Sequence, residues 1–232
     1  MSLPDLTSNA LALLKDAISD SRYGKIATVS SFGAESAVLL HLVAQVDQSA
    51  PVLFIDTRML FQETLDYKIK LTRHLGLTDI RTISPEWQEI QKRDIWGRMH
   101  SDNPDACCDF RKTSVLDKAL APFDGWITGR KRFQALTRND LRQVEKAANR
   151  KIKLNPLADW HPDDLSEYME WFDLPQHPLR NHGYASIGCA TCTSPVADGE
   201  DRRSGRWRGM NKIECGIHLD KVQAVQESKQ DV

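Results

Sequence analysis

The stretch KIATVSSFGAESAVLLHLVAQV, residues 25–46, decides the fold. Its first residues predict a buried strand, since Ile26 and Val29 are apolar, and residues 37–46 predict an apolar helix. The loop between them, residues 30–36, is small and polar, so its backbone N–H groups can approach an anion at the helix N-terminus. We therefore expect a phosphate-binding loop here, with an ordinary strand-to-helix turn as the alternative. Three hydroxyl donors are available in it: Ser30, Ser31 and Ser36.

Strands and helices alternate along the first 175 residues. The predicted strands cover 25–30, 51–56, 79–83, 125–128 and 151–154, and the predicted helices cover 5–20, 37–46, 61–75, 107–120 and 163–172. The strands are apolar on both faces, which is typical of a parallel sheet with helices on both sides. We therefore predict a doubly wound α/β core over residues 1–175. Residues 176–232, rich in Gly, Arg, Cys and His, are expected to form a tail integrated with that core.

The second predicted strand ends in Asp56 and Thr57. Polar residues at the carboxyl end of a buried parallel strand lie where such sheets bind their ligands. Capping of the next helix by Thr57 and Glu63 is the alternative interpretation.

Composition excludes several classes of protein. The chain has 232 residues, with 31 Lys and Arg against 32 Asp and Glu, which leaves a net charge of −1. A basic nucleic-acid binder would carry a large positive charge, and no apolar run approaches the roughly 20 residues of a membrane span. The N-terminus shows no secretory signal. We therefore expect a cytoplasmic protein that binds neither nucleic acid nor membrane.

Five cysteines are present, and four of them form two close pairs. Cys107 and Cys108 are adjacent, and Cys189 and Cys192 form a C-x-x-C turn. An odd number of cysteines without a signal peptide argues against a disulfide framework. Two pairs supply four thiolates, enough for a tetrahedral zinc ion or an iron–sulfur cluster. Adjacent cysteines suit a cluster better, because they can bind different irons. Asp105 is expected to cap the helix that begins here.

Cys215 stands apart, near the end of the chain. It follows a run of basic residues, including Arg203 and Arg206, that would favour its thiolate, whereas Glu214 would oppose ionisation. His218 can stabilise a thiolate or bind a substrate. A basic run in a chain of net negative charge favours a bound anion over a merely solvated face.

Several segments together resemble one family. They are Ser-Phe-Gly-Ala-Glu-Ser at 31–36, Ile-Asp-Thr at 55–57, Cys-Cys-x-x-Arg-Lys at 107–112, Ile-Thr-Gly-x-Lys-Arg at 127–132, Cys-x-x-Cys at 189–192, Gly-Arg-Trp at 205–207 and Glu-Cys-Gly-Ile-His at 214–218. The loop also resembles that of the adenine-nucleotide alpha-hydrolase superfamily, with Glu35 at its usual Asp position. The chain as a whole resembles the assimilatory adenylyl-sulfate reductases, relatives of the phosphoadenylyl-sulfate reductases.

The resemblance implies a fold, a reaction and a set of site residues. The fold is the alpha-hydrolase-like doubly wound sheet, with the active cysteine on the C-terminal tail. Cys215 would attack the sulfur of adenylyl sulfate and expel AMP, and thioredoxin, or glutaredoxin or glutathione, would release sulfite from the resulting S-sulfocysteine. A [4Fe–4S] cluster, one per subunit of a homo-oligomer, would be bound by Cys107, Cys108, Cys189 and Cys192.

Further roles follow from the same resemblance. Lys112 and His218 would assist Cys215 in catalysis. The substrate would be bound by Ser30, Ser31, Phe32, Gly33, Glu35, Ser36, Asp56, Thr57, Lys131, Arg132, Arg203 and Arg206.

The sequence is compatible with three alternatives. The resemblance implies adenylyl sulfate as substrate, because the branch of the family with the two cysteine pairs typically uses it, and a reductase that uses the 3′-phosphorylated form or both is the first alternative. An ATP pyrophosphatase of the same superfamily also fits the phosphate loop and cysteine pairs. A nucleotide-binding module with a structural four-cysteine zinc is the non-enzymatic alternative.

Overall fold

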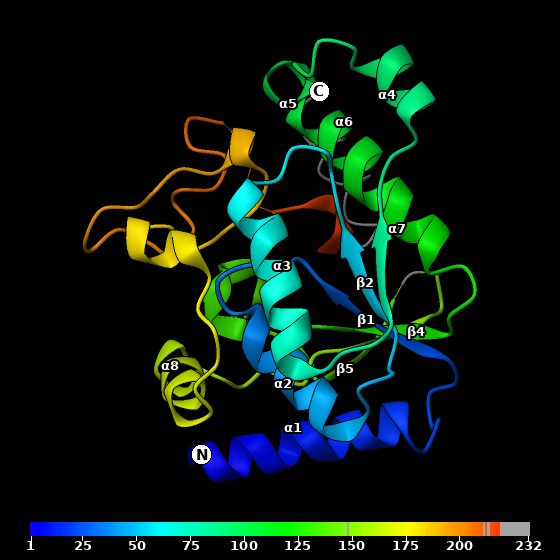
Figure 1. The fold of residues 1–232 in the computed structure, drawn as a ribbon, viewed down its shortest axis with the longest axis vertical. Helices are drawn as coiled ribbons and strands as arrows, with labels where there is room; N and C mark the ends of the chain where they lie inside the picture. Colours follow the sequence, from blue (N-terminus) through cyan, green and yellow to red (C-terminus); the bar gives the residue numbers. More distant parts are fainter. Residues whose placement is uncertain (148, 211, 213, 219–232) are drawn as a thin grey trace.

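A mostly parallel sheet forms the centre of the molecule (Figure 1). The computed structural model describes residues 1–147, 149–210, 212 and 214–218, without the side chains of Leu136 and His218. In these residues the strand order is β3-β2-β1-β4-β6-β5, and only β5 and β6 pair antiparallel. The strands are β1 Ile26–Ser30, β2 Val52–Ile55, β3 Ile80–Ile83, β4 Gly125–Thr128, β5 Val144–Lys146 and β6 Ile152–Leu154.

Helices cover both faces of the sheet, as predicted. In β2, Val52 and Phe54 face one layer and Leu53 and Ile55 face the other, because successive strand residues alternate. The larger layer contains α1 Leu3–Ile18, α2 Ser36–Val46, α3 Gln62–Leu75 and α8 Pro162–Trp171. The smaller layer is built on α7 Ser114–Ala119. The doubly wound α/β fold is therefore confirmed.

The predicted helix over 107–120 is interrupted. It consists of α6 Pro104–Cys108, a π-helical turn η1 Asp109–Thr113, and α7. The expected cap is also wrong, because Asn103 and not Asp105 accepts a hydrogen bond from the N–H of Ala106 (2.9 Å). Asp105 instead pairs with Lys212. Two short helices, α4 Trp87–Arg93 and α5 Met99–Asp102, precede this segment.

A buried ion pair fixes the approach to this interrupted helix. Arg111 donates to Asp94 (2.7 Å) and to the carbonyl of Thr57 (2.9 Å), and both charged side chains are 3% exposed. Asp94 also accepts from the N–H of Met99 (2.9 Å). The end of β2, the segment after α4 and the π turn therefore meet at one guanidinium.

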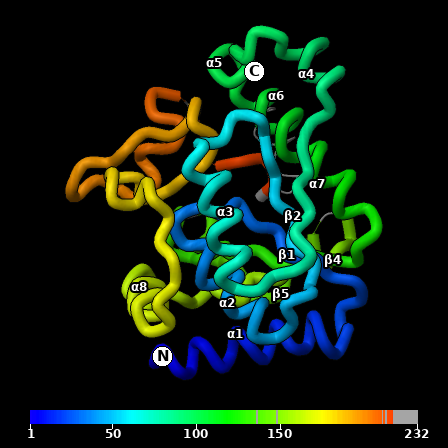
Figure 2. Tube along the Cα trace, in the orientation of Figure 1, coloured from blue at the N-terminus to red at the C-terminus, as the bar shows by residue number. Residues whose placement is uncertain are grey.

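The tail beyond residue 176 contains short 3₁₀ turns and no longer helix among its described residues. They are η4 Pro178–His182, η5 Ala190–Cys192 and η6 Gly216–His218, and two earlier turns, η2 Arg132–Gln134 and η3 Leu136–Arg138, follow β4. The arrows of β1 and β2 in Figure 1 show the end of the sheet to which these strands point, and in Figure 2 the yellow and orange tail leaves α8 and passes beside that end. The tail begins with His177, whose Nε2 lies 3.0 Å from Thr64 Oγ1 of α3.

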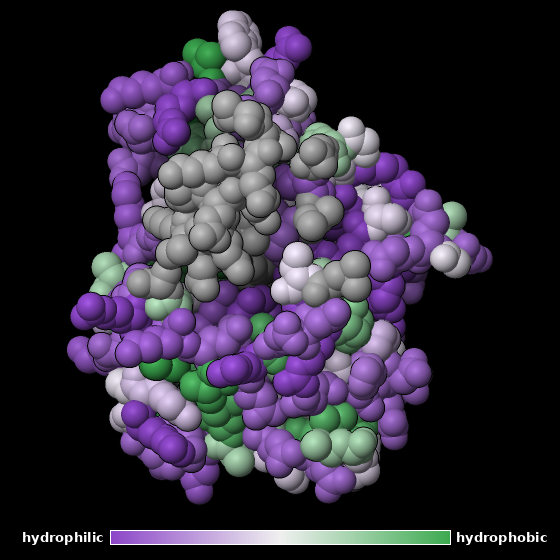
Figure 3. Space-filling model, turned by 180° about the vertical axis from the view of Figure 1, so that it is seen from behind, coloured by the Kyte–Doolittle hydropathy of each residue, from purple (hydrophilic) through white to green (hydrophobic). Residues whose placement is uncertain are grey.

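The strand order contains a switch point between β1 and β4. From β1 the chain moves to β2 and β3 on one side, whereas β4 and β6 lie on the other. Parallel α/β sheets bind ligands outside the carboxyl ends of the strands at such a point. No helix in the described residues has the length and apolar character needed to span a membrane. On the face seen in Figure 3 the coloured surface is mostly hydrophilic.

Candidate active site

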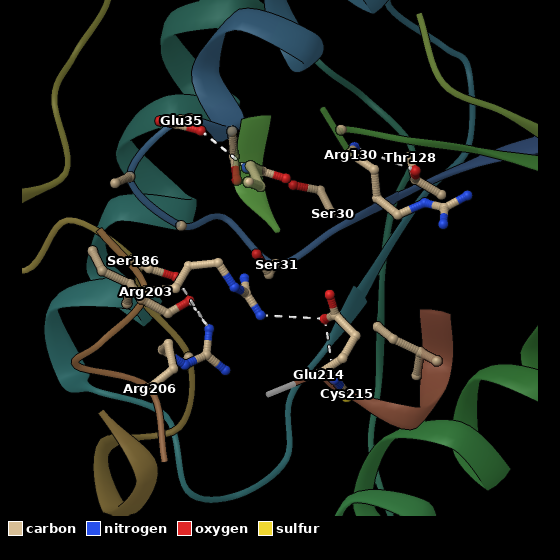
Figure 4. A pocket seen from close by; sticks show the side chains of 18 of the residues that line it. Ser30, Ser31, Glu35, Thr128, Arg130, Ser186, Arg203, Arg206, Glu214 and Cys215 are labelled. Atoms are coloured by element: carbon tan, nitrogen blue, oxygen red, sulfur yellow. Dashed lines mark hydrogen bonds and ion pairs between the residues drawn. The ribbon is translucent and has the colours of Figure 1, made fainter. Parts of the chain in front are cut away.

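A cavity of about 250 Å³ lies at the switch point (Figure 4). The ends of β1 and β4 and the loops after them form one wall, and the tail forms the other. The side chains labelled in Figure 4 come from both walls. The cavity is lined by residues 29–31, 33–36, 128–131 and 185–188, among others, and by Arg202, Arg203, Arg206, Glu214 and Cys215.

The loop after β1 presents its backbone to this cavity. Ser30 Oγ accepts a hydrogen bond from the N–H of Phe32 (3.2 Å), which tightens the turn. Phe32 has a φ of 49°, in the left-handed region, and its ring packs edge-on against Phe54 (5.4 Å between centroids). Ser31, Gly33 and Ser36 line the cavity.

Glu35 links this loop to the tail. It accepts hydrogen bonds from Lys131 Nζ (2.8 Å), Gln134 Nε2 (3.2 Å) and Arg202 Nη2 (2.8 Å). Burial raises the pKa of Glu35, but the charges of Lys131 and Arg202 outweigh burial and hold the pKa below its usual value. Glu35 is therefore a carboxylate, and its pair with Arg202 spans the cavity from loop to tail.

Cys215 is a buried nucleophile candidate at the cavity. It is 6% exposed and packs with Cys108 and Trp207. A hydrogen bond from the Cys108 thiol, together with the charges of Lys112 and Arg206, outweighs burial and lowers the pKa of Cys215 below its usual value. The thiolate is the reactive form of cysteine, so this arrangement can perform nucleophilic substitution.

Two cations lie beside Cys215. Burial opposes the charge of Lys112, but the nearby thiols of Cys189 and Cys215 raise its pKa above the usual value. Arg206 lies over the Trp207 ring (4.5 Å to the centroid), and its Nη1 is 3.4 Å from the carbonyl of Ile187. Its Nε is buried without a hydrogen-bond partner in the described residues. This edge of the cavity is therefore suited to an anion.

Glu214 is paired on both carboxylate oxygens. Oε2 accepts from Arg138 Nε (3.0 Å) and Nη2 (2.8 Å), and Oε1 accepts from Arg203 Nη2 (3.2 Å). Oε1 also accepts from the N–H of Cys215 (3.1 Å). The expected opposition of Glu214 to ionisation of Cys215 is thus weakened by two neighbouring guanidinium groups.

The two cysteine pairs meet between the tail and the π turn. Thr57 Oγ1 lies 3.2 Å from Cys189 Sγ, and Cys189 forms a β-bridge with Leu60. Burial, with the neighbouring thiols of Cys189 and Cys192, raises the pKa of Cys107 to about 11. No three His, Cys, Asp or Glu side chains among the described residues are grouped closely enough to hold a single metal ion. The potential metal ligands are the four thiols of the two cysteine pairs, and Lys112 lies near them.

The sequence profile of the phosphoadenosine phosphosulfate reductase domain matches residues 25–195. The chain belongs to this reductase family. The resemblance seen in the sequence is therefore confirmed, and the chain is a member of a family of oxidoreductase enzymes.

Curated relatives of this reductase extend over most of its length. It is 51% identical to an adenosine 5′-phosphosulfate reductase of Mesorhizobium japonicum, over 85% of this chain and 77% of the relative. It is 38% identical to one of Bacillus mycoides, over 93% and 92% of the two chains. A phosphoadenosine 5′-phosphosulfate reductase of Gloeobacter violaceus is 40% identical, over 84% and 82%.

Solved structures agree on the fold of this reductase. The phosphoadenylyl-sulfate reductase of Candida auris, in a phosphate complex, superposes with a TM-score of 0.68 over 84% of this chain and 96% of that one, at 22% identity. An FMN adenylyltransferase of Candida glabrata superposes with a TM-score of 0.60 over 99% and 82%, at 15% identity. The alpha-hydrolase-like fold class is thereby confirmed.

Three predicted substrate-binding side chains of this reductase do not line the cavity. Phe32 packs in the core, Asp56 accepts from the N–H of Arg58 (2.8 Å), and Arg132 pairs with Asp159 and donates to the carbonyl of Leu141 (2.8 Å). These three residues were expected at the site because they lie within segments that resemble the family, but neighbouring side chains in a segment can face different ways. The side chain of His218 lies outside the described part of the structure.

Other cavity residues were missed by the sequence interpretation. Arg130 lies within the Ile-Thr-Gly-x-Lys-Arg segment, which was a usable signal, and it is held by Asn155 (3.3 Å) and Glu145. Arg138 has no such signal, because its partner Glu214 is 76 positions away. The remaining cavity residues not predicted include Thr128, Gln134, Ser186 and Arg202.

Proposed function

We propose that the chain is an adenylyl-sulfate reductase that converts adenylyl sulfate to AMP and sulfite in assimilatory sulfate reduction. The observation that carries the proposal is Cys215, a buried thiol that lines a cavity at the switch point together with Lys112 and Arg206. Relatives named for this activity, up to 51% identical, support the choice of substrate. The alternative substrate is phosphoadenylyl sulfate, because a relative at 40% identity is named for it.

In the first step the Cys215 thiolate attacks the sulfur of the sulfate group. A bond forms between the two sulfur atoms, and the bond between that sulfur and the bridging oxygen breaks. AMP leaves with the electron pair, and Cys215 becomes an S-sulfocysteine. Lys112, Arg203 and Arg206 would neutralise the charge of the sulfate group, so that the anionic nucleophile can approach it.

In the second step a dithiol reductant completes the reduction. One of its thiolates attacks Cys215 Sγ, and sulfite leaves with the electrons of the sulfur–sulfur bond. The second thiol of the reductant then displaces Cys215 and forms a disulfide. Two electrons thus pass from the dithiol to the sulfate sulfur. We propose thioredoxin as this reductant, with glutaredoxin as an alternative dithiol. Two molecules of glutathione, each supplying one of the two thiols, are the other alternative.

The nucleotide would bind along the loop after β1. Its phosphate would accept hydrogen bonds from the backbone and hydroxyl groups of residues 30–36 at the N-terminus of α2. Lys131 and Thr57 line the same cavity. Asp56, Arg132 and the ring of Phe32 face elsewhere, so we do not assign them substrate contacts. His218 is proposed to assist Cys215 on the sequence resemblance alone.

A [4Fe–4S] cluster, one per chain, fits the cysteine arrangement. Cys107, Cys108, Cys189 and Cys192 would hold it, and Lys112 would offset its negative charge. The adjacent Cys107 and Cys108 favour a cluster over one zinc ion, because the irons of a cluster are spread over several ångströms and neighbouring thiolates can bind different irons. When bound, the cluster would supply negative charge and a covalent link between the tail and the π turn.

We extend the proposal to organisation and location. Residues 176–232 would act as a catalytic tail integrated with the core of residues 1–175. The chain would work in the cytoplasm as a homo-oligomer.

Sulfite release tests the proposal directly. Purified protein is given adenylyl sulfate and reduced thioredoxin, and sulfite and AMP are measured. Cys215→Ser is expected to abolish both products, and full activity in this variant would overturn the mechanism. A higher kcat/KM with phosphoadenylyl sulfate would reverse the substrate assignment. Release of pyrophosphate from ATP would instead favour an ATP pyrophosphatase.

A further inference from the structure

The carboxylate of Glu214 joins three separate segments at the nucleophile. Arg138 comes from η3 after β4, Arg203 from the tail loop, and Cys215 from the segment that ends in η6. Figure 4 shows Glu214 between the Arg203 guanidinium and the Cys215 backbone. A single side chain thus connects the sheet, the tail loop and the nucleophile.

Glu214 and Arg138 form a buried ion pair. The side chains of Glu214 and Arg138 are 5% and 6% exposed, whereas that of Arg203 is 17% exposed. Removing one partner of a buried pair leaves the other charge unpaired, which is strongly destabilising. Arg138 binds with two nitrogen atoms, and this bidentate geometry fixes direction as well as distance.

The position of the nucleophile follows from these bonds. The N–H of Cys215 donates to the oxygen that also accepts from Arg203, so the backbone of the nucleophile and a cavity cation share one anchor. Of the two arginines that bind Glu214, Arg138 is the more buried. If the Glu214 carboxylate moved, Cys215 and Arg203 would move together relative to the loop after β1.

We propose that Glu214 is a positioning residue that, held by Arg138, sets Cys215 and Arg203 in line with the sulfate group. The inference rests on the proposed function, because it assigns a role within that reaction. Glu214 itself takes no part in bond making. Its effect is on the rate of the first step and not on the affinity for the nucleotide. The hydrogen bonds of Glu214 go to Arg138, Arg203 and Cys215. Arg138 reaches the loop of residues 30–36 indirectly, through Gln134 and Glu35.

The test is a single-turnover measurement without reductant. Enzyme in excess is mixed with adenylyl sulfate, and the rate and amplitude of AMP release are followed. In Glu214→Gln, which keeps one acceptor oxygen but loses the charge, the rate should fall by about 100-fold, as expected for a reacting group displaced by about 1 Å. The amplitude and the Kd for AMP should stay unchanged. A variant that merely folds poorly would lose amplitude instead.

Glu200→Gln is the matched control. Glu200 also accepts from an arginine of the tail, Arg208 (2.8 Å), but this pair does not line the cavity. Its AMP release should stay within about twofold of the unchanged chain, as is usual for surface substitutions. Equal rates in Glu214→Gln and this control would overturn the proposal.

Arg138 provides two further variants. In Arg138→Met the rate should fall about as far as in Glu214→Gln, and the double variant should be no slower than either, because the two residues act as one unit. If the loss of rate in the double variant equals the product of the losses in the two single variants, the proposal is overturned. If Glu214→Gln does not fold, Arg138→Lys retains the charge with a single hydrogen bond and should show a smaller loss of rate at full amplitude. An unchanged rate in Arg138→Lys would overturn the proposal in that case.

The same experiment separates this inference from the proposed function. If the unchanged chain releases no AMP from adenylyl sulfate, the proposed function fails. If it releases AMP and the Glu214 variant does so equally fast, only the positioning role fails. A parallel fall in rate and AMP affinity would show that Glu214 serves binding, which also contradicts the proposal.

Discussion

Acidification should destabilise the protein through His177. This residue is 0% exposed, its Nδ1 accepts from the N–H of Leu179 (3.2 Å), and its Nε2 faces Thr64 Oγ1 (3.0 Å). A ring that accepts at Nδ1 is neutral, and a proton there would oppose the N–H of Leu179. Burial, only partly offset by the carboxylate of Glu63, lowers the pKa of His177 to about 4.

The magnitude follows from the difference between the folded and unfolded states. An unfolded histidine has a pKa near 6.5, so folding lowers the pKa by about 2.5, which corresponds to about 3 kcal/mol. Between these two values the unfolded chain binds a proton that the folded chain does not. The free energy of unfolding therefore falls as pH decreases, starting near pH 6.5 and completed near pH 4.

Urea unfolding at a series of pH values measures this effect. The variant His177→Asn retains an acceptor and a donor but does not titrate, so the other groups cancel in the comparison. From about pH 7 to about pH 4, the unchanged chain should lose about 3 kcal/mol more stability than the variant. Parallel pH profiles for the two chains would refute the reasoning.

Four further predictions concern other parts of the molecule. Asp94→Ala should lower the free energy of unfolding by about 3–5 kcal/mol, measured by urea titration, because Arg111 then loses its buried partner; a loss below about 1 kcal/mol would contradict this. Gly125→Ala should prevent stable pairing of β4 with β6, since the added Cβ would lie 2.3 Å from the Ile152 carbonyl; an unchanged melting temperature is the contrary result. Lys112→Met should slow single-turnover AMP release by at least about 100-fold, as removal of one charge-stabilising group does elsewhere, whereas an unchanged rate would exclude the role proposed for this cation. Anaerobically purified protein should contain about four irons and four acid-labile sulfides per chain, and bound zinc without sulfide would contradict the cluster.

The sequence predicted the parts of the fold that depend on local patterns. Apolar runs located β1, β2 and β4, and Gly76, with a φ of 67°, ends α3 at the predicted place. β5 was missed because its three residues are at the edge and largely exposed, so they carry no apolar signal. The π turn was missed as well, since hydrogen bonding over five residues leaves no recognisable pattern in composition.

The site was predicted less completely, for a physical reason. Segments with a local motif, such as the loop after β1 and the cysteine pairs, could be found in the sequence. Contacts between distant residues could not: Glu35 meets Arg202 across 167 positions. Neighbouring side chains also diverge, and Lys131 faces the cavity whereas Arg132 pairs with Asp159 outside it.

The π turn at Asp109–Thr113 changes the direction in which the side chains of α6 face relative to those of α7. It contains one residue more than an α-helical turn, and one helical residue corresponds to about 100° of rotation. α7 can therefore keep Leu116 under the sheet while Cys107 and Cys108 turn toward the tail. Deleting one residue from the π turn would rotate either Leu116 away from the sheet or the two cysteines away from the tail. The length of this segment, and not only its composition, should thus distinguish relatives that carry the cysteine pairs from those that do not.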